Sequence, residues 1–178
     1  QAIISGLAID TTINNLGSQI ILQGGSATNT TINSGGIQEI SSGGYALSTT
    51  VSSAGNQYIL GGGSADFTSV LNGGNQYISS GGEANSNTVL AGGNLYAEAG
   101  AVVNGTIISS GGTEYVSSGA VVDDSVINSG GAQHVLYSGT TNRTIINSSG
   151  YQSVYLGGLA NSTRINNGGL QDVAGSAL

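Results

Sequence analysis

The sequence is built from a unit of 19 residues that recurs from one end to the other without an insertion. Each unit carries two turns rich in glycine, the second eleven residues after the first. A unit this short cannot bury an apolar face by itself, so successive units must stack on one another. The first turn recurs at Gly24-Gly25, Gly43-Gly44, Gly62-Gly63, Gly81-Gly82 and Gly157-Gly158, and the second at Gly35-Gly36, Gly73-Gly74, Gly92-Gly93, Gly111-Gly112, Gly130-Gly131 and Gly168-Gly169.

Three columns of the aligned units are aliphatic or small in nearly every row, beginning at Ala8, Ile13 and Ile21. The segments around them are short and rich in Thr, Ile, Val and Tyr, which is typical of strands. Glycine suits the corners because it adopts positive φ without a steric cost. We therefore predict an all-β fold, a parallel β-helix (solenoid) with 19 residues per rung and about nine rungs, forming a rod on the order of 45 Å long.

Composition excludes several other classes of protein. The 178 residues include 32 Gly and no Pro, which rules out collagen, and no apolar run approaches the ~20 residues of a membrane helix. The absence of Cys excludes a disulfide framework, and no segment resembles a signal peptide. The net charge of −7 makes nucleic acid and anionic membrane surfaces unfavourable partners. A disordered linker would not keep β-branched residues in register over nine rows.

Strand alternation predicts which polar columns face inward. With Ile32 inward, Thr30 also points in, and so does the column of glutamines that includes Gln38. The hydroxyls can bond to corner backbone groups or form a ladder between rungs, and stacked amides bond along a stack, so we interpret both columns as structural. Leu95 and Glu114 depart from the glutamine column.

Three outward columns are candidate contact surfaces. One holds four consecutive tyrosines, which either contact a sugar or protein partner or stabilise the rod by stacking on one another. A second carries three aliphatic residues in succession, Ile107, Val126 and Ile145. A third is polar and suits contact between rods, although Asn and Asp are also ordinary corner residues. The candidate contact residues are Tyr58, Tyr77, Tyr96, Tyr115, Asp66, Asn85, Asn104, Asp123, Asn142 and Asn161.

The sequence offers no constellation for catalysis, metal binding or a cofactor. Glycosidases need two carboxylates about 5–10 Å apart, but no two of the nine acids occupy one column in adjacent rows. Asp123 and Asp124 are expected to point to opposite sides of a strand, and His134 has no Ser or Asp partner. A polysaccharide-cleaving β-helix enzyme is therefore disfavoured.

The unit from Gly24 to Ser42, GGSATNTTINSGGIQEISS, closely resembles the 19-residue repeats of AIDA-type self-associating autotransporter adhesins of Gram-negative bacteria, and the resemblance covers all 178 residues. It implies a right-handed β-helix on the bacterial surface, anchored to the outer membrane or secreted, that supports adhesion, autoaggregation and biofilm formation. The implied partners are copies on other cells and host surfaces. Since family members also carry an export signal and a C-terminal outer-membrane barrel, we expect residues 1–178 to be one segment of a longer passenger, with no direct insertion into the membrane.

The resemblance also implies a modifying enzyme, because several members are hyperglycosylated by a dedicated cytoplasmic heptosyltransferase that adds heptose to Ser and Thr. Accessible acceptors should then lie in turns or on outward strand positions. An alternative role follows, in which the rod is a spacer and glycan scaffold and adhesion resides elsewhere. The candidate acceptors are Ser34, Ser42, Ser80, Ser110, Ser118 and Ser129, followed by Thr31 and Thr50.

Overall fold

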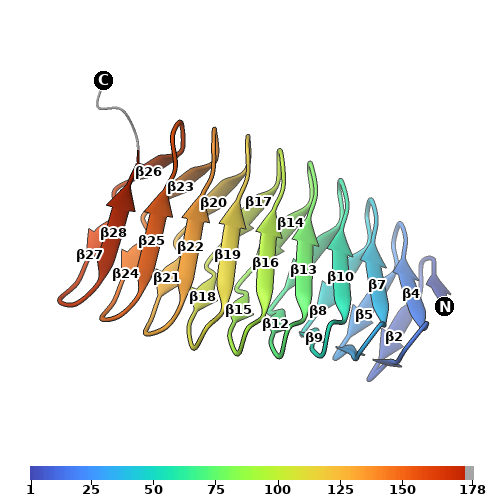
Figure 1. Ribbon diagram of the computed structural model, residues 1–178. Coiled ribbons are helices and arrows are strands. Elements are labelled where there is room, and N and C mark those ends of the chain that lie inside the picture. The colour runs from blue at the N-terminus through green and yellow to red at the C-terminus, as the bar shows by residue number, and fades with distance from the viewer. Residues whose placement is uncertain (175–178) are drawn as a thin grey trace.

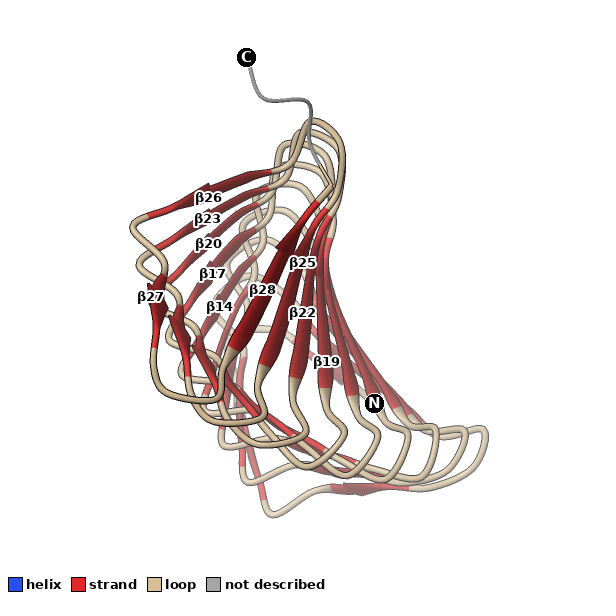
Figure 2. Ribbon diagram, turned by 60° about the vertical axis from the view of Figure 1, so that its left-hand side comes forward, coloured by secondary structure: helices blue, strands red, loops and turns tan. Residues whose placement is uncertain are grey.

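The computed structural model describes residues 1–174 and forms a parallel β-helix, which confirms the prediction. Each 19-residue unit makes one rung of three short strands, and each strand pairs in parallel with its equivalent one unit later, as in Tyr58 with Tyr77. The rungs stack into the rod of Figure 1. Figure 2 shows that the strands lie on three sides of the rung and are joined by loops.

The first sheet contains ten parallel strands, most of them four residues long. Its inward positions hold the glutamine column and the aliphatic column that begins at Ile21. Its strands are β1 (Ala2–Ile3), β4 (Ser18–Ile21), β7 (Ile37–Ile40), β10 (Asn56–Ile59), β13 (Asn75–Ile78), β16 (Asn94–Ala97), β19 (Thr113–Val116), β22 (Ala132–Val135), β25 (Tyr151–Val154) and β28 (Leu170–Val173).

The second sheet contains nine strands of three residues each, with the Ala8 column at the inward central position. Small residues here let the wall of the rod lie close to the other two sheets. Its strands are β2 (Leu7–Ile9), β5 (Ser26–Thr28), β8 (Tyr45–Leu47), β11 (Ser64–Asp66), β14 (Glu83–Asn85), β17 (Val102–Asn104), β20 (Val121–Asp123), β23 (Thr140–Asn142) and β26 (Leu159–Asn161).

The third sheet contains nine strands of two residues each. In each strand the first residue faces outward and the second belongs to the aliphatic column that begins at Ile13. Its strands are β3 (Thr12–Ile13), β6 (Thr31–Ile32), β9 (Thr50–Val51), β12 (Ser69–Val70), β15 (Thr88–Val89), β18 (Ile107–Ile108), β21 (Val126–Ile127), β24 (Ile145–Ile146) and β27 (Arg164–Ile165).

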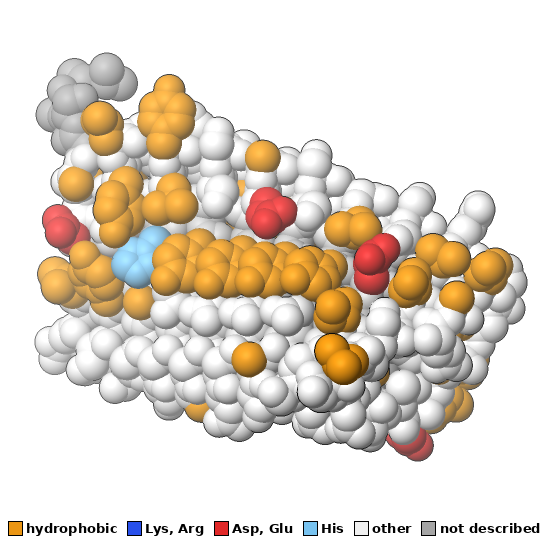
Figure 3. All heavy atoms as spheres, turned by 45° about the vertical axis from the view of Figure 1, so that its right-hand side comes forward, with side chains coloured by type: hydrophobic (Ala, Val, Ile, Leu, Met, Phe, Trp, Pro, Cys, Tyr) orange, Lys and Arg blue, Asp and Glu red, His pale blue; other side chains and the backbone are white. Residues whose placement is uncertain are grey.

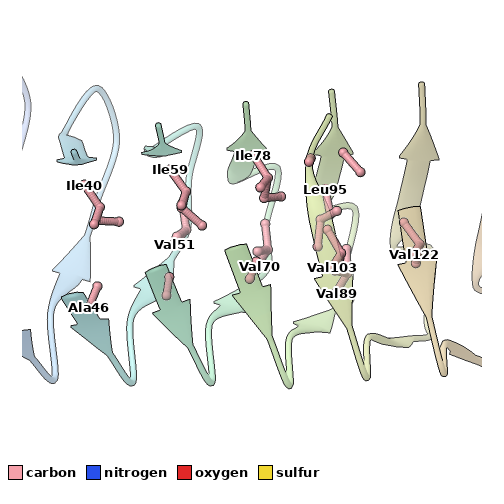
Figure 4. Close-up of a cluster of buried hydrophobic side chains, with 14 of the residues drawn as sticks. Ile40, Ala46, Val51, Ile59, Val70, Ile78, Val89, Leu95, Val103 and Val122 are labelled. Carbon is pink, nitrogen blue, oxygen red and sulfur yellow. The ribbon is translucent and has the colours of Figure 1, made fainter. Parts of the chain in front are cut away.

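The core is a narrow apolar column that runs the length of the rod. Side chains from all three sheets meet there, and those of the middle rungs are fully buried, as the close-up around Ile59 and Val70 shows (Figure 4). Burial ends at the last rung, where Ile165 is 48% exposed and Val173 is 58% exposed. The predicted aliphatic columns are therefore the core.

The two residues of a glycine pair serve different purposes. The first adopts positive φ, as in Gly43 with φ of 75°. The second lies against the preceding rung, and a Cβ on Gly44 would come 2.5 Å from the carbonyl oxygen of Ile21. Ala101 and Ala120 occupy the equivalent position in two rungs and are buried there.

A third corner, between the second and third sheets, was not anticipated. Its residue has positive φ in every rung, although only one member of the column is glycine. At every corner before the last, the backbone N–H donates to a carbonyl of the next rung, as Ser48 does to Asp66 at 3.0 Å. The corner residues are Asp10, Asn29, Ser48, Phe67, Ser86, Gly105, Asp124, Arg143 and Ser162.

Candidate functional site

The inward polar columns form a hydrogen-bonded ladder inside the rod. The Nε2 atom of Gln57 donates to Oε1 of Gln38 at 2.8 Å, and Gln76 donates to Gln57 at 2.9 Å. The Thr68 hydroxyl donates to Oε1 of Gln57 at 3.2 Å. These side chains are buried, so the structural interpretation of both columns is confirmed and neither is available to a partner.

The ladder is interrupted where Leu95 replaces glutamine. The Oε1 atoms of Gln76 and Glu114, on the rungs before and after Leu95, have no hydrogen-bond partner, and neither does the hydroxyl of Thr106. Burial raises the pKa of the Glu114 carboxyl, while the hydrogen bonds from Gln133 and Ser125 act in the opposite direction. Glu114 is thus an acid within the core that is held toward its neutral form.

The four outward tyrosines, Tyr58, Tyr77, Tyr96 and Tyr115, form a continuous stack, called here the tyrosine ladder. Successive ring centroids are 5.0, 4.8 and 5.0 Å apart, with interplanar angles of 11°, 7° and 5°. The ladder is the orange stripe along the middle of Figure 3. Burial, followed by the neighbouring tyrosines, raises the pKa of the Tyr77 and Tyr96 hydroxyls.

Stacking decides what the tyrosine ladder presents to a partner. The faces of its rings are occupied by one another, so solvent meets ring edges and hydroxyl groups. A sugar that stacks on an aromatic face would find no free face on Tyr77, Tyr96 or Tyr115, because neighbouring rings cover both of their faces. The stack is therefore part of the fold, its contribution to stability stays a prediction, and a partner would meet mainly ring edges and hydroxyls.

Charged or ionisable residues lie at both ends of the tyrosine ladder. Glu39 pairs with Tyr58 across β7 and β10, and His134 pairs with Tyr115 across β19 and β22. The His134 ring stacks on Tyr115 with centroids 5.3 Å apart. Burial lowers the pKa of His134, and its Nδ1 atom has no hydrogen-bond partner. In the next rung the column holds Ser153, so the stack stops.

The polar candidate column forms ladders of its own. Nδ2 of Asn85 donates to Asp66 at 2.9 Å, and Nδ2 of Asn104 donates to Asn85 at 2.9 Å. The same pattern links Asn142 to Asp123 at 2.6 Å and Asn161 to Asn142 at 2.9 Å. Many of the amide donors are thus engaged along the rod, and the column presents its remaining groups to solvent.

The expectation that Asp123 and Asp124 point to opposite sides is wrong. Strand β20 ends at Asp123, and Asp124 occupies the third corner with φ of 57°, so strand alternation stops between them. Arg143, one rung later, donates to both oxygens of Asp124 at 2.7 and 2.9 Å and lies 3.4 Å from Asp123. The hydrogen bond from Arg143 lowers the pKa of Asp124.

The candidate acceptor serines are all exposed in turns. Ser42, Ser80 and Ser118 belong to the turn after the first sheet. The turn after the third sheet also contains exposed Ser53 and Ser148, which the prediction omitted although the 19-residue period places them in the same column. Thr31 and Thr50 are half-buried on the outward face of the third sheet. The remaining members of the set lie in the third-sheet turn, at Ser34, Ser110 and Ser129.

Within residues 1–174, no group of three His, Cys, Asp or Glu side chains lies close enough to hold a metal ion. Over the same residues, no helix has the length and apolar character needed to cross a membrane. The polar features of the described rod are its ladders, turns and corners.

Known proteins place the chain in a family. A family model described as "Adhesin of bacterial autotransporter system, probable stalk" matches residues 2–55. No curated protein matches the sequence. Among solved structures, the TibC-catalyzed hyper-glycosylated fragment of TibA is 30% identical over 99% of this chain and 92% of that one, with a TM-score of 0.53. The chain therefore belongs to the AIDA-type autotransporter adhesins, as a surface-exposed structural rod made of their passenger repeats.

Proposed function

We propose that the rod mediates adhesion and autoaggregation, and through them biofilm formation, by contacting copies of itself on other cells. The observation that carries the proposal is the repetition of the same outward columns on every rung without an interrupting loop. Each rung offers a small contact, and a second contact becomes intramolecular once the first has formed. Many weak contacts then sum to a strong attachment without any single deep site or catalytic chemistry.

Display of rods of different lengths tests this proposal. Versions with three, six and nine rungs are made by removing whole 19-residue units, which preserves every column and turn. They are attached to the outer membrane of a non-aggregating strain, at equal surface density, and settling of the culture is measured. We expect aggregation to rise steeply with rung number, and aggregation that is indifferent to length would contradict the multivalent mechanism.

Host surfaces are a second class of adhesive partner for the same rod. Adherence of the three length variants to cultured epithelial cells, with binding by purified rods as a competitor, measures that contact separately. Dependence on rung number there would extend the multivalent mechanism to heterotypic contacts. Loss of host adherence with retained settling would restrict the rod to self-association.

A second proposed function is that of a glycan scaffold modified by a heptosyltransferase. Two observations favour it: the similar TibA fragment is hyper-glycosylated, and the candidate serines of this chain stand exposed in turns. The enzyme would need an acceptor hydroxyl that protrudes from the rod, which Ser42 and Ser110 provide and the buried Thr30 does not.

Intact-glycopeptide mass spectrometry after co-expression with a heptosyltransferase tests the scaffold. We expect heptose on the turn serines first and on Thr31 and Thr50 to a lesser degree. A variant with Ser42→Ala, Ser80→Ala and Ser118→Ala should lose modification at one turn and keep it at the other. Heptose found mainly on the Thr30 column would contradict the proposed acceptors.

A further inference from the structure

The outward column that contains the tyrosine ladder has a symmetry of its own. Over six consecutive rungs it reads Glu39, the four tyrosines and His134. The midpoint of this series falls between Tyr77 and Tyr96. If a second copy of the series is laid alongside the first in the reverse order, the glutamate at each end lies opposite a histidine. Each tyrosine then lies opposite another tyrosine.

We propose that two copies of this chain associate with their rods antiparallel and their tyrosine ladders face to face, about a two-fold axis between Tyr77 and Tyr96. The proposal rests on the self-association proposed above and names its face. Such an interface is self-complementary, because every contact occurs twice. It brings Glu39 opposite His134 of the second copy at both ends, and Tyr58 opposite Tyr115 of the second copy.

Charge complementarity favours this antiparallel arrangement over a parallel pair and over an antiparallel pair shifted by one rung. Parallel rods on the same face would place Glu39 opposite Glu39 of the second copy, which is a like-charge contact. An antiparallel pair shifted by one rung would place Glu39 opposite Tyr115 of the second copy and lose the contact with the imidazole at both ends. His134 is half-buried and its Nδ1 atom is buried in the single rod, so the contact with Glu39 of the second copy would use Nε2, and imidazole donates to a carboxylate whether it is neutral or protonated.

The columns that flank the tyrosine ladder agree with the same axis. On one side, Asn75 would meet Asn94 of the second copy, and amides can both donate and accept. On the other side, the exposed Glu98, which already accepts a hydrogen bond from Ser79 of its own chain at 2.9 Å, would meet Ser79 of the second copy. No like charges therefore oppose each other across the six rungs.

The dimensions of the face predict a weak dimer. Five rung steps of about 4.8 Å give a length of roughly 24 Å, and a four-residue strand is about 13 Å wide. Such a face belongs with transient interfaces, which bury less than about 1,200 Å² in total. Each copy also carries a net charge of −7, so overall repulsion opposes association. Stable attachment would come from many such pairs between two cells.

Charge exchange tests the proposal in the purified chain. Glu39→Lys and His134→Glu are prepared separately, and dimerisation is measured by sedimentation equilibrium at pH 6 and physiological salt. Each variant alone alters the contacts at both ends of the interface. One exposed ion pair changes Kd by about 1.4- to 5-fold, so the loss of both contacts should raise Kd by about 2- to 30-fold. An equimolar mixture should recover dimers, since the two substituted positions then face each other at one end.

The matched control is Glu83→Lys, which makes the same charge change on the outward face of the second sheet. It should not weaken the dimer, and it should not rescue His134→Glu in a mixture. Failure of the Glu39→Lys and His134→Glu mixture to recover dimers beyond this control would overturn the proposal.

Disulfide trapping gives a second readout in a chain that has no natural cysteine. Oxidation of mixed Asn75→Cys and Asn94→Cys chains should give the mixed dimer in excess over either symmetric dimer. A mixed dimer that is no more abundant than the symmetric dimers would refute the axis. On cells, unchanged settling by Glu39→Lys together with settling that depends on rod length would exclude this face while leaving the proposed function intact.

Discussion

Replacing the buried acid, Glu114→Gln, should stabilise the rod at neutral pH. Glu114 Oε1 and the Thr106 hydroxyl are both buried without partners, eight residues apart. The same spacing links Gln19 to Thr11, where Nε2 donates to the hydroxyl at 3.3 Å. A glutamine at 114 would make the equivalent bond and would still accept from Gln133 and Ser125, as the Glu114 carboxyl does now.

The magnitude follows from the groups that gain partners. An unsatisfied buried polar group costs about 1–3 kcal/mol, and more when it is charged. We therefore expect Glu114→Gln to raise the free energy of unfolding by about 1–3 kcal/mol at pH 7. For a chain of this size, each kcal/mol raises Tm by about 2–4 °C.

The pH dependence has a definite sign. Because burial raises the pKa of Glu114 in the folded rod, the folded state keeps a proton that the unfolded state releases above about pH 4. The wild-type rod therefore loses stability as the pH rises from about 4 through the pKa that Glu114 has in the folded state. Glu114→Gln lacks this contribution, so its advantage should be small near pH 4 and should grow toward pH 8.

Urea unfolding followed by circular dichroism at pH 4, 5.5, 7 and 8 measures this difference. Hydrogen exchange of peptides from β16 to β22 shows whether the change in stability lies in the rungs around Glu114. This localisation is needed because repeat proteins can unfold rung by rung. The control is Glu98→Gln, which removes an exposed carboxylate and should change stability by less than about 0.5 kcal/mol. A Glu114→Gln variant that is less stable at pH 7, or an advantage that shrinks as pH rises, would refute the reasoning.

Three further substitutions test other parts of the rod, each by chemical denaturation. Ile59→Ala removes a fully buried side chain and should cost about 2–5 kcal/mol, so a cost below 1 kcal/mol would mean that the rungs collapse around the cavity. Tyr96→Ala loses two stacked neighbours and should cost about 1–3 kcal/mol, and an unchanged midpoint would show that stacking adds no stability. Asn85→Ala breaks two outward hydrogen bonds and should cost about 0.5–3 kcal/mol, with no loss expected if water replaces both.

Much of the fold could be predicted from the sequence because the 19-residue period shows each position of the rung about nine times. Ile32 or Gln38 alone would say little, but the same residue type at the same offset on each rung indicates an inward position. The third corner was not predicted because its column contains Asn29, Phe67 and Arg143, whose side chains have no common chemistry. Only the backbone is conserved there, and the tertiary pairing of neighbouring rungs imposes positive φ on whatever residue is present.

The candidate site was predictable in its residues but not in its geometry. Alternation along the strands placed the tyrosines outward and the candidate serines at turns, as the structure has them. Whether the tyrosine rings stack or point apart depends on side-chain packing between rungs, and the aligned sequence does not give that packing. The contact between Arg143 and the two neighbouring aspartates was missed for a related reason, since it depends on where β20 ends.

The direction of the hydrogen bonds has a mechanical consequence for a surface rod under flow. The hydrogen bonds of the strands join each rung to the rungs before and after it, while bonds within a rung are confined to turns and inward polar side chains, so tension along the axis loads one rung at a time. A released rung yields up to about 60–70 Å of extended chain in exchange for about 4.8 Å of rod. The rod would thus lengthen under load by shedding rungs from its end, while the columns of the remaining rungs stay in register.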